Sequence, residues 1–384
     1  MRNTYVENWQ RIKDRFEQWW NREAWTRPLM RIIAAGKPHA ESPEALGPGT
    51  QGKLKDPKDP QDPQDPQDPQ DPKDLYLDVP CIVKKFRNFC KTHYFLADAF
   101  PQVDINLGPG SMALYLGGEP EFAWDTVWYR EKCSSPREFK NLHYDENNFW
   151  WKLHQEMMKE AVELSTEDFY VAIPDIIENL DILSALRGPQ NLCFDLLDEP
   201  DAVAQGLKII DDLYFRYYDR CYELLKDRDF SCAYTAFSIL GQGRIAKIQC
   251  DFSALISPEI FRDYVLVSLT RQCRNLDHSV YHLDGPDAIK HVPALMEIQE
   301  LNALQWTCGA GKPDGAFEDW YPIYDKVHEA GKGLWISLHD GSPEDWAKSA
   351  KRLVKRYGAR GLYFIFPVFP DLAQAKKMEA LFDK

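Results

Sequence analysis

The feature that most constrains this fold is a regular alternation of strand and helix patterns from about residue 145 to the end of the chain. Short apolar runs at 278–284, 302–307, 333–338 and 360–366 are each followed by a stretch with helical periodicity, such as residues 343–356. Residues 230–237 predict an earlier strand. This alternation is typical of β–α–β units, which build parallel sheets. We therefore expect a (β/α)₈ barrel. An open doubly wound sheet is the alternative, although the chain lacks the Gly-x-Gly-x-x-Gly turn and the P-loop found in many such folds.

The amino-terminal part extends this pattern. Tryptophan and other apolar side chains recur at helical spacing over residues 4–24, which predicts a helix with a buried face. Residues 29–35 predict a first strand, residues 76–100 a helical region and residues 103–107 a short strand. We expect a single domain over residues 1–384, with a helical extension before the barrel.

A proline repeat interrupts this domain. Residues 56–73 are six tandem triplets of Asp-Pro-Lys or Asp-Pro-Gln. Proline at every third position fixes φ and removes backbone donors, so regular helix and sheet are excluded. Polyproline II, with three residues per turn, is compatible with the repeat. We expect residues 40–75 to be an inserted loop that is either disordered or in the polyproline II conformation.

Charge and composition exclude several classes of partner. The formal net charge of −14, without a cluster of basic residues, opposes binding to nucleic acid or to an anionic membrane. No apolar run approaches the roughly 20 residues that span a bilayer, and the first residues do not form a secretory signal. The nine cysteines contain no Cys-x-x-Cys pair, which predicts reduced thiols and a cytoplasmic protein.

Polar residues at strand ends are the candidates for chemistry, because catalytic side chains of parallel barrels lie at the carboxyl ends of strands. His282 and Asp284 are two residues apart and therefore share one face of their strand. Such a pair can bind a divalent metal, or the carboxylate can orient the imidazole as a base. Asp251, at another strand end, is the third candidate catalytic residue.

Other strand ends offer further candidates, each with a structural alternative. His339 precedes Asp340-Gly341, which also reads as a turn. Cys308 is a possible metal ligand beside His282 and Asp284, or a packed thiol. The remaining candidates for contact with substrate follow or end other strands, and the acidic ones among them are equally compatible with helix caps or loop anchors: Trp306, Asp175, Asn179 and Asp181.

At these residues the sequence resembles the superfamily of uroporphyrinogen decarboxylases and corrinoid-dependent methyltransferases. The resemblance covers nearly the whole chain except the proline repeat. It implies a (β/α)₈ barrel with a deep cleft, often assembled as a homodimer. The matching stretches are residues 19–28 followed by Arg31, 181–188 (DILSALRG), 195–200 (DLLDEP), 251–259 (DFSALISPE) and 281–285 (YHLDG).

The departures from the family patterns narrow the function. The decarboxylases carry Arg-Gln-Ala-Gly-Arg near the amino terminus, where residues 33–37 read Ile-Ala-Ala-Gly-Lys. Their Asn-Leu-Gly-His segment is replaced by Phe-Pro-Val-Phe at 366–369. The methyltransferases bind zinc through His-x-Cys, whereas this chain has His282-Leu-Asp284. A carboxylate in place of the thiolate makes a harder site, suited to an oxygen or to another divalent ion.

Three hypotheses follow. In the first, the chain is a methyltransferase-like enzyme that demethylates a small ether-like or amine-like substrate, using a divalent metal such as zinc and a corrinoid carried by a partner protein. Aromatic residues Trp124, Trp128 and Tyr129 would then line the cleft. In the second, it is a cofactor-free decarboxylase, which requires Arg187 or Arg244 in the cleft. In the third, it is a non-catalytic barrel that binds a small molecule.

Overall fold

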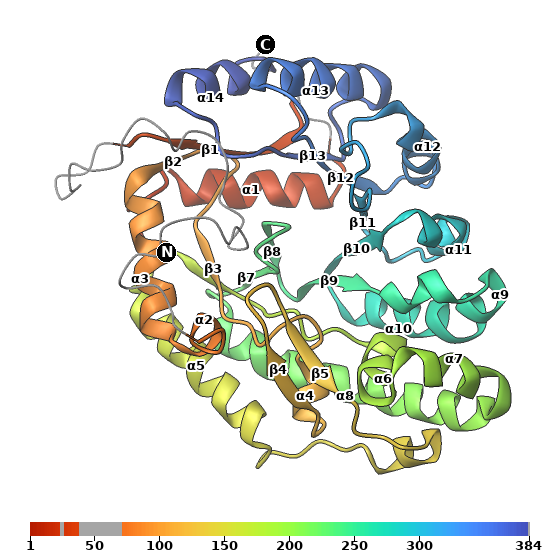
Figure 1. Ribbon diagram of the computed structural model, residues 1–384. Helices are drawn as coiled ribbons and strands as arrows, with labels where there is room; N and C mark the ends of the chain where they lie inside the picture. The colour runs from red at the N-terminus through yellow and green to blue at the C-terminus, as the bar shows by residue number, and fades with distance from the viewer. Residues whose placement is uncertain (24–26, 38–70, 383–384) are drawn as a thin grey trace.

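The computed structural model describes residues 1–23, 27–37 and 71–382, and shows a mixed α/β fold in which helices surround the strands (Figure 1). The central sheet has seven strands. Six of them run parallel, and one pairs antiparallel with the first strand at an edge. In order across the sheet they are β2 (His93–Ala97), β1 (Leu29–Ala35), β13 (Leu362–Ile365), β12 (Gly333–Ser337), β11 (Ala303–Thr307), β10 (His278–Asp284) and β9 (Ile245–Gln249).

Helices connect successive parallel strands, as the alternating sequence pattern predicts. The best defined is α13 (Pro343–Tyr357), which begins with a capping box: the Ser342 hydroxyl accepts from the Asp345 backbone N–H, and the Asp345 carboxylate accepts from the Ser342 backbone N–H. The other crossovers of this half contain α10 (Leu266–Asn275), α11 (Val292–Met296) and α12 (Tyr321–Glu329), and α14 (Leu372–Glu379) follows the last strand.

Helix α1 (Trp9–Trp20) packs against the amino ends of the strands. Its buried stripe comes from the periodic apolar residues of the sequence, and Asn8 caps its first turn. The Trp19 indole donates to the carbonyl of Gly361, just before β13, and the Trp20 indole donates to Leu240. Since α1 covers this end of the sheet, the carboxyl ends of the strands are left for a site.

The remaining strands form a second group. β3 (Gln102–Asp104) pairs parallel with β6 (Tyr170–Ala172), and a parallel bridge joins Ile173 to Ala233 at the end of β7 (Phe230–Ala233). β7 then forms a hairpin with β8 (Ile239–Gln242). The expected closed barrel is not shown: in the described part of the chain no ladder joins β7 to β9 or β3 to β1. The physical reason is that β2 occupies the free edge of β1, while the β7–β8 hairpin precedes β9.

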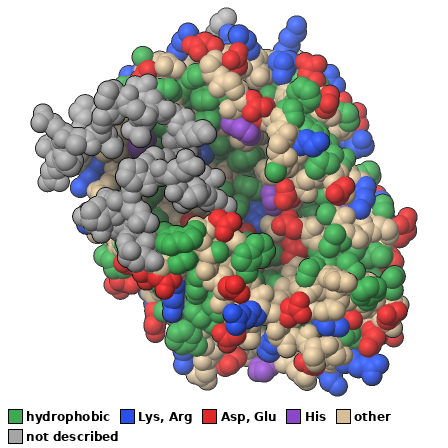
Figure 2. All heavy atoms as spheres, in the orientation of Figure 1, with side chains coloured by type: hydrophobic (Ala, Val, Ile, Leu, Met, Phe, Trp, Pro, Cys, Tyr) green, Lys and Arg blue, Asp and Glu red, His purple; other side chains and the backbone are tan. Residues whose placement is uncertain are grey.

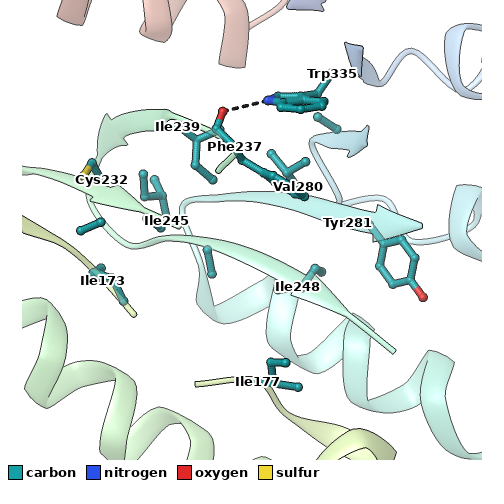
Figure 3. Close-up of a cluster of buried hydrophobic side chains, with 14 of the residues drawn as sticks. Ile173, Ile177, Cys232, Phe237, Ile239, Ile245, Ile248, Val280, Tyr281 and Trp335 are labelled. Carbon is teal, nitrogen blue, oxygen red and sulfur yellow. Dashed lines mark hydrogen bonds between the residues drawn. The ribbon is translucent and has the colours of Figure 1, made fainter. Parts of the chain in front are cut away.

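Buried side chains from both groups form one core (Figure 3). Phe237, in the turn of the β7–β8 hairpin, packs against Trp335 of β12 with ring centroids 5.0 Å apart, and its carbonyl accepts from the Trp335 indole. The Tyr363 hydroxyl of β13 donates to the carbonyl of Ser238 at 2.7 Å. The central sheet therefore curves around the hairpin.

Two long helices and several short elements complete the fold below the second group of strands. Helix α8 (Pro200–Leu225) packs against α5 (Phe149–Ser165) and α6 (Asn179–Arg187), and α3 (Val79–Thr92) packs against α5. The remaining elements are α2 (Asp74–Leu77), α4 (Met112–Tyr115), β4 (Glu119–Phe122), β5 (Val127–Arg130), α7 (Pro189–Asp198) and α9 (Pro258–Ile260).

Two local expectations need correction. Residues 76–100 were expected to be helical, but after α3 the chain forms strand β2, because residues 93–97 complete the edge of β1. The expected strand at 230–237 ends at Ala233 and turns into the hairpin. Of the loop expected at 40–75, residues 40–70 lie outside the described part of the chain.

All nine cysteines are free, and six of them are buried. Among the described helices none combines the length and apolarity needed to cross a bilayer.

Candidate functional site

The carboxyl ends of β9 and β10 bring three predicted residues together. Asp251, His282 and Asp284, here called the central cluster, each offer a ligand atom, and these atoms lie within 4.8 Å of one another. Strand register explains this arrangement, because Gln249 pairs with His282 and so places Asp251 near Asp284, two residues further along each strand. Gly285 follows with a φ of 76°, which allows the chain to turn away directly after the cluster.

His282 is held as a neutral imidazole in one tautomer. Its Nδ1 bonds the side-chain oxygen of Gln305 on β11. The Gln305 amide nitrogen donates to the Thr307 hydroxyl at 2.8 Å, which fixes the amide orientation. Nδ1 therefore carries the proton, and the lone pair remains on Nε2. Burial lowers the pKa of His282 to about 4, and the positive charge of Lys247 adds to this shift.

The carboxylates of this region crowd one another. Asp181 accepts hydrogen bonds from the backbone N–H groups of Asp251 at 2.9 Å and Phe252 at 2.8 Å, so it anchors the loop after β9. The Gln249 amide donates to both Asp181 and Asp251. Burial raises the pKa of Asp251, and the negative charges of Asp181 and Asp284 raise it further. A cation placed among these oxygens would relieve the repulsion.

Lys247 supplies a positive charge inside the fold. Its ammonium lies 2.7 Å from the Asp175 carboxylate and also contacts the Gln249 side chain, and its side chain is only 2% exposed. Asp175 was expected to anchor substrate, but in the structure its carboxylate forms an ion pair with Lys247 inside the protein. Asp175 and Lys247 line a small cavity with Tyr234, separate from the cleft that Asp251 lines.

A cleft of about 480 Å³ adjoins the central cluster through Asp251. Figure 2 shows a face of the molecule that is hollowed near its centre, with acidic side chains along one side of the hollow. Trp128 and Tyr129 of β5, which were predicted to contact substrate, line the cleft. The Trp128 side chain is 64% exposed, and the Tyr129 hydroxyl donates to the Leu107 carbonyl. Trp124 is exposed but is not among the residues lining this cleft.

Three predicted residues lie outside both the central cluster and the residues that line the cleft. Trp306 pairs with Leu283 in the ladder, lies 2% exposed and packs against Trp320, so it faces the helix layer and not the cleft. Cys308 is outside the central cluster, and burial raises the pKa of its thiol to about 12. The half-exposed imidazole of His339 bonds the Ser337 hydroxyl and lies 4.0 Å from the Asp340 carboxylate, outside the central cluster.

The two arginines on which decarboxylation was expected to depend have partners elsewhere. Arg187 binds the Asp195 carboxylate through its Nε at 2.7 Å. Arg244 binds the Asp219 carboxylate at 2.9 Å. Arg244 directly precedes β9 and therefore lies at the amino end of that strand. Neither is among the residues that line the cleft.

Sequence reasoning missed the residues that support the central cluster. Gln305, Lys247 and Gln249 are buried polar side chains within short strands. Alternation places each of them on the inward face; Gln305 and Gln249 pair with His282 in the ladder, and Lys247 pairs with Val280. A polar residue in the middle of an otherwise apolar strand was the signal that could have identified them.

Comparison with known proteins gives a likeness of fold. No protein-family model matches the chain, and no curated protein matches it by sequence. A methyltransferase from Methanosarcina mazei has a similar structure, with a TM-score of 0.57 and 11% sequence identity, covering 97% of this chain and 98% of that one. A putative aldo-keto reductase from Pseudomonas aeruginosa aligns over 71% of this chain and 97% of its own, with 12% identity and a TM-score of 0.31.

Proposed function

We propose that this chain is a metal-dependent, methyltransferase-like enzyme that removes a methyl group from a small substrate and passes it to a corrinoid carried by a partner protein. It would be a divergent member of the uroporphyrinogen decarboxylase and corrinoid-dependent methyltransferase superfamily. The observation that carries the proposal is the convergence of Asp251, His282 and Asp284 beside a cleft. The likeness of fold to a methyltransferase over 97% of the chain supports it.

The proposal includes a closed (β/α)₈ arrangement of the single domain. Two observations support it. The contacts of Phe237 with Trp335 and of Ser238 with Tyr363 join the hairpin to strands on the other side of the curved sheet. The strands β3, β6 and β7 are joined to one another by parallel pairing, so the second group of strands is also parallel. Closure would place every parallel strand with its carboxyl end toward one cleft.

The donor set of the central cluster fits a divalent metal. Two carboxylates and one neutral imidazole suit zinc and other borderline or hard divalent ions, and three protein ligands leave a position for substrate. A bound ion would act as a Lewis acid on the heteroatom that carries the methyl group. Gln305 would keep Nε2 of His282 available as a ligand, and Gln249 would orient Asp251.

The side chains that line the cleft indicate which groups a substrate would contact. Trp128 and Tyr129 offer flat apolar faces, which suit a small methylated group. Leu255 also lines the cleft and is 60% exposed, so the rim presents apolar surface to the outside. A partner protein that carries the corrinoid would have to reach the substrate from this side.

Metal analysis of the purified protein tests the proposal. We expect about one divalent ion per chain in the wild type and a loss of most of it in His282→Ala, because the variant removes one of three ligands. The matched control is His339→Ala, which lies outside the central cluster and should retain the metal. Equal metal content near zero in wild type and His282→Ala, after incubation with zinc, cobalt or manganese, would overturn the metal site.

Methyl transfer is measured separately. Free cob(I)alamin, incubated with the metal-loaded protein and candidate methyl ethers or methylamines, is converted to methylcobalamin if the enzyme transfers a methyl cation to cobalt. The conversion is followed by the change in the corrin absorption spectrum. Turnover that requires both protein and substrate is the expected result, and metal binding without transfer from any donor would favour a binding protein.

A further inference from the structure

The cleft beside the central cluster combines carboxylates with aromatic side chains. Glu131, Asp181 and Asp251 line it together with Trp128 and Tyr129. None of the described residues that line the cleft is a lysine, an arginine or a histidine. Figure 2 shows the acidic side chains along one side of the hollow. The cleft therefore repels an anion and attracts a cation.

Glu131 is the lining carboxylate that the protein leaves without a partner. It directly follows β5, and it forms no hydrogen bond or ion pair with another described residue. Its carboxylate lies against Gly188 between α6 and α7, where a Cβ would come within 2.2 Å of Oε1. The amino end of α7 attracts the carboxylate and so holds it at this wall of the cleft.

A metal ion in the central cluster would not remove the negative charge of the cleft. A divalent ion balances the two carboxylates that bind it, and the charges of Asp181 and Glu131 remain. Asp181 accepts only from uncharged donors, namely two backbone N–H groups and an amide. Lys247, the nearby ammonium, is already paired with Asp175 at 2.7 Å. The cleft thus requires a cation from outside.

The size and the walls of the cleft indicate an organic cation. Its volume of about 480 Å³ far exceeds the roughly 30 Å³ that one water occupies in the liquid. Apolar side chains such as Val127, Ile182 and Leu255 form much of the lining. The Trp128 side chain is 64% exposed on the same wall as Glu131. An indole attracts a substituted ammonium group, which is large and weakly hydrated.

We propose that the substrate of this cleft carries a substituted ammonium group, which the Glu131 carboxylate and the Trp128 indole bind. This inference rests on the proposed function and names the substrate class of the same site. A substituted ammonium nitrogen has no lone pair for a metal, so the methylated heteroatom is a second group of the substrate. That heteroatom would lie toward Asp251, which lines the cleft and belongs to the central cluster.

Binding of small cations tests the proposal. Calorimetry and ligand-observed NMR would use choline and tetramethylammonium. The neutral counterpart is the carbon analogue of choline, in which a tert-butyl group replaces the trimethylammonium group, and acetate is the anion. We expect choline to bind about tenfold more tightly than its neutral analogue, because the ion pair and the cation–π contact both need the charge. Equal binding of the two, or no binding of either cation, would overturn the assignment.

Variants of one hairpin locate the binding. Glu131→Gln and Trp128→Leu should each weaken the binding of choline about two- to fivefold and leave the neutral analogue unaffected. The matched controls lie on the same β4–β5 hairpin outside the cleft lining. Glu121→Gln removes an exposed carboxylate paired with Arg130, and Trp124→Leu removes an exposed indole. Both controls should bind as the wild type does, and unchanged affinity in Glu131→Gln rejects the proposal.

Two further titrations separate this proposal from the metal site. They use EDTA-treated wild type and the His282→Ala variant, each compared with its counterpart that also carries Glu131→Gln. Choline binding that depends on Glu131 in these proteins supports the substrate class even if the metal site fails. Binding that no longer depends on Glu131 there counts against a role of this carboxylate in holding the substrate.

Discussion

Two clusters of charge lie near opposite ends of the same sheet, and they differ in how completely they are neutralised. At the amino end of β1, the fully buried Asp98 carboxylate accepts from Arg15, Arg27 and the backbone N–H of Met30. At the carboxyl ends of β9 and β10, carboxylates instead face one another, and the pKa of Asp251 is raised by burial and by its acidic neighbours. The first cluster pairs its carboxylate with cations inside the protein, whereas in the second the carboxylates repel one another.

The same contrast separates two histidines. His154 on α5 uses both ring nitrogens within the protein: Nε2 donates to the Ile105 carbonyl at 2.8 Å, and Nδ1 accepts from the Tyr115 hydroxyl. Among the described residues, His282 uses only Nδ1 in this way. Burial lowers the pKa of each to about 4. A fully bonded histidine is a structural group, while one with a free lone pair beside carboxylates is available for a ligand.

The largest expected effect on stability comes from removing the Asp98 carboxylate. Asp98→Asn removes the carboxylate that two buried guanidiniums share, and it should lower the free energy of unfolding by about 3–5 kcal/mol. Urea unfolding at pH 7 measures the change. The comparison variant Asp284→Asn should leave stability unchanged or raise it, because it relieves repulsion at the other end. A loss of stability in Asp284→Asn equal to that in Asp98→Asn would remove the distinction between the clusters.

The next effect concerns the fully bonded histidine. The folded pKa of His154 is about 4, below the unfolded value of about 6.5, so only the unfolded chain takes up the proton between these values. His154 therefore lowers stability as the pH falls from 6.5 to 4, by up to about 3 kcal/mol, and has no such effect above pH 6.5. His154→Gln should reduce this slope in urea unfolding curves recorded from pH 4 to 7. Parallel curves for the two proteins would contradict the prediction.

A smaller effect is expected from replacing Gln305, which supports the central cluster. Gln305→Leu removes the acceptor that holds Nδ1 of His282, so we expect metal affinity to fall about 10–100-fold with the three ligands still present. Gln305→Glu keeps an acceptor oxygen at this position and should restore most of the affinity. Competition with a fluorescent zinc chelator measures both values. Unchanged affinity in Gln305→Leu would show that the glutamine does not position the imidazole.

Much of the fold could be predicted because its patterns are local. The strand at 278–284 appears with the expected bounds, and the helix expected at 343–356 is found as Pro343–Tyr357. Strand β2 was missed because residues 93–97 are strand only through pairing with the edge of β1. The β7–β8 hairpin was missed for a similar reason, since its turn is held by contacts with residues of β12 and β13 that lie 98 and 125 residues later in the chain.

Alternation along a single strand was enough to place His282 and Asp284 on the same face, because the side-chain period of a strand is a property of the local backbone. Tertiary structure alone decided their neighbours. Strand register brought Asp251 to them, set Gln305 against the imidazole and turned Trp306 toward the helices. Each of these outcomes depends on pairing between segments that are distant in the sequence, and so on interactions that no local pattern encodes.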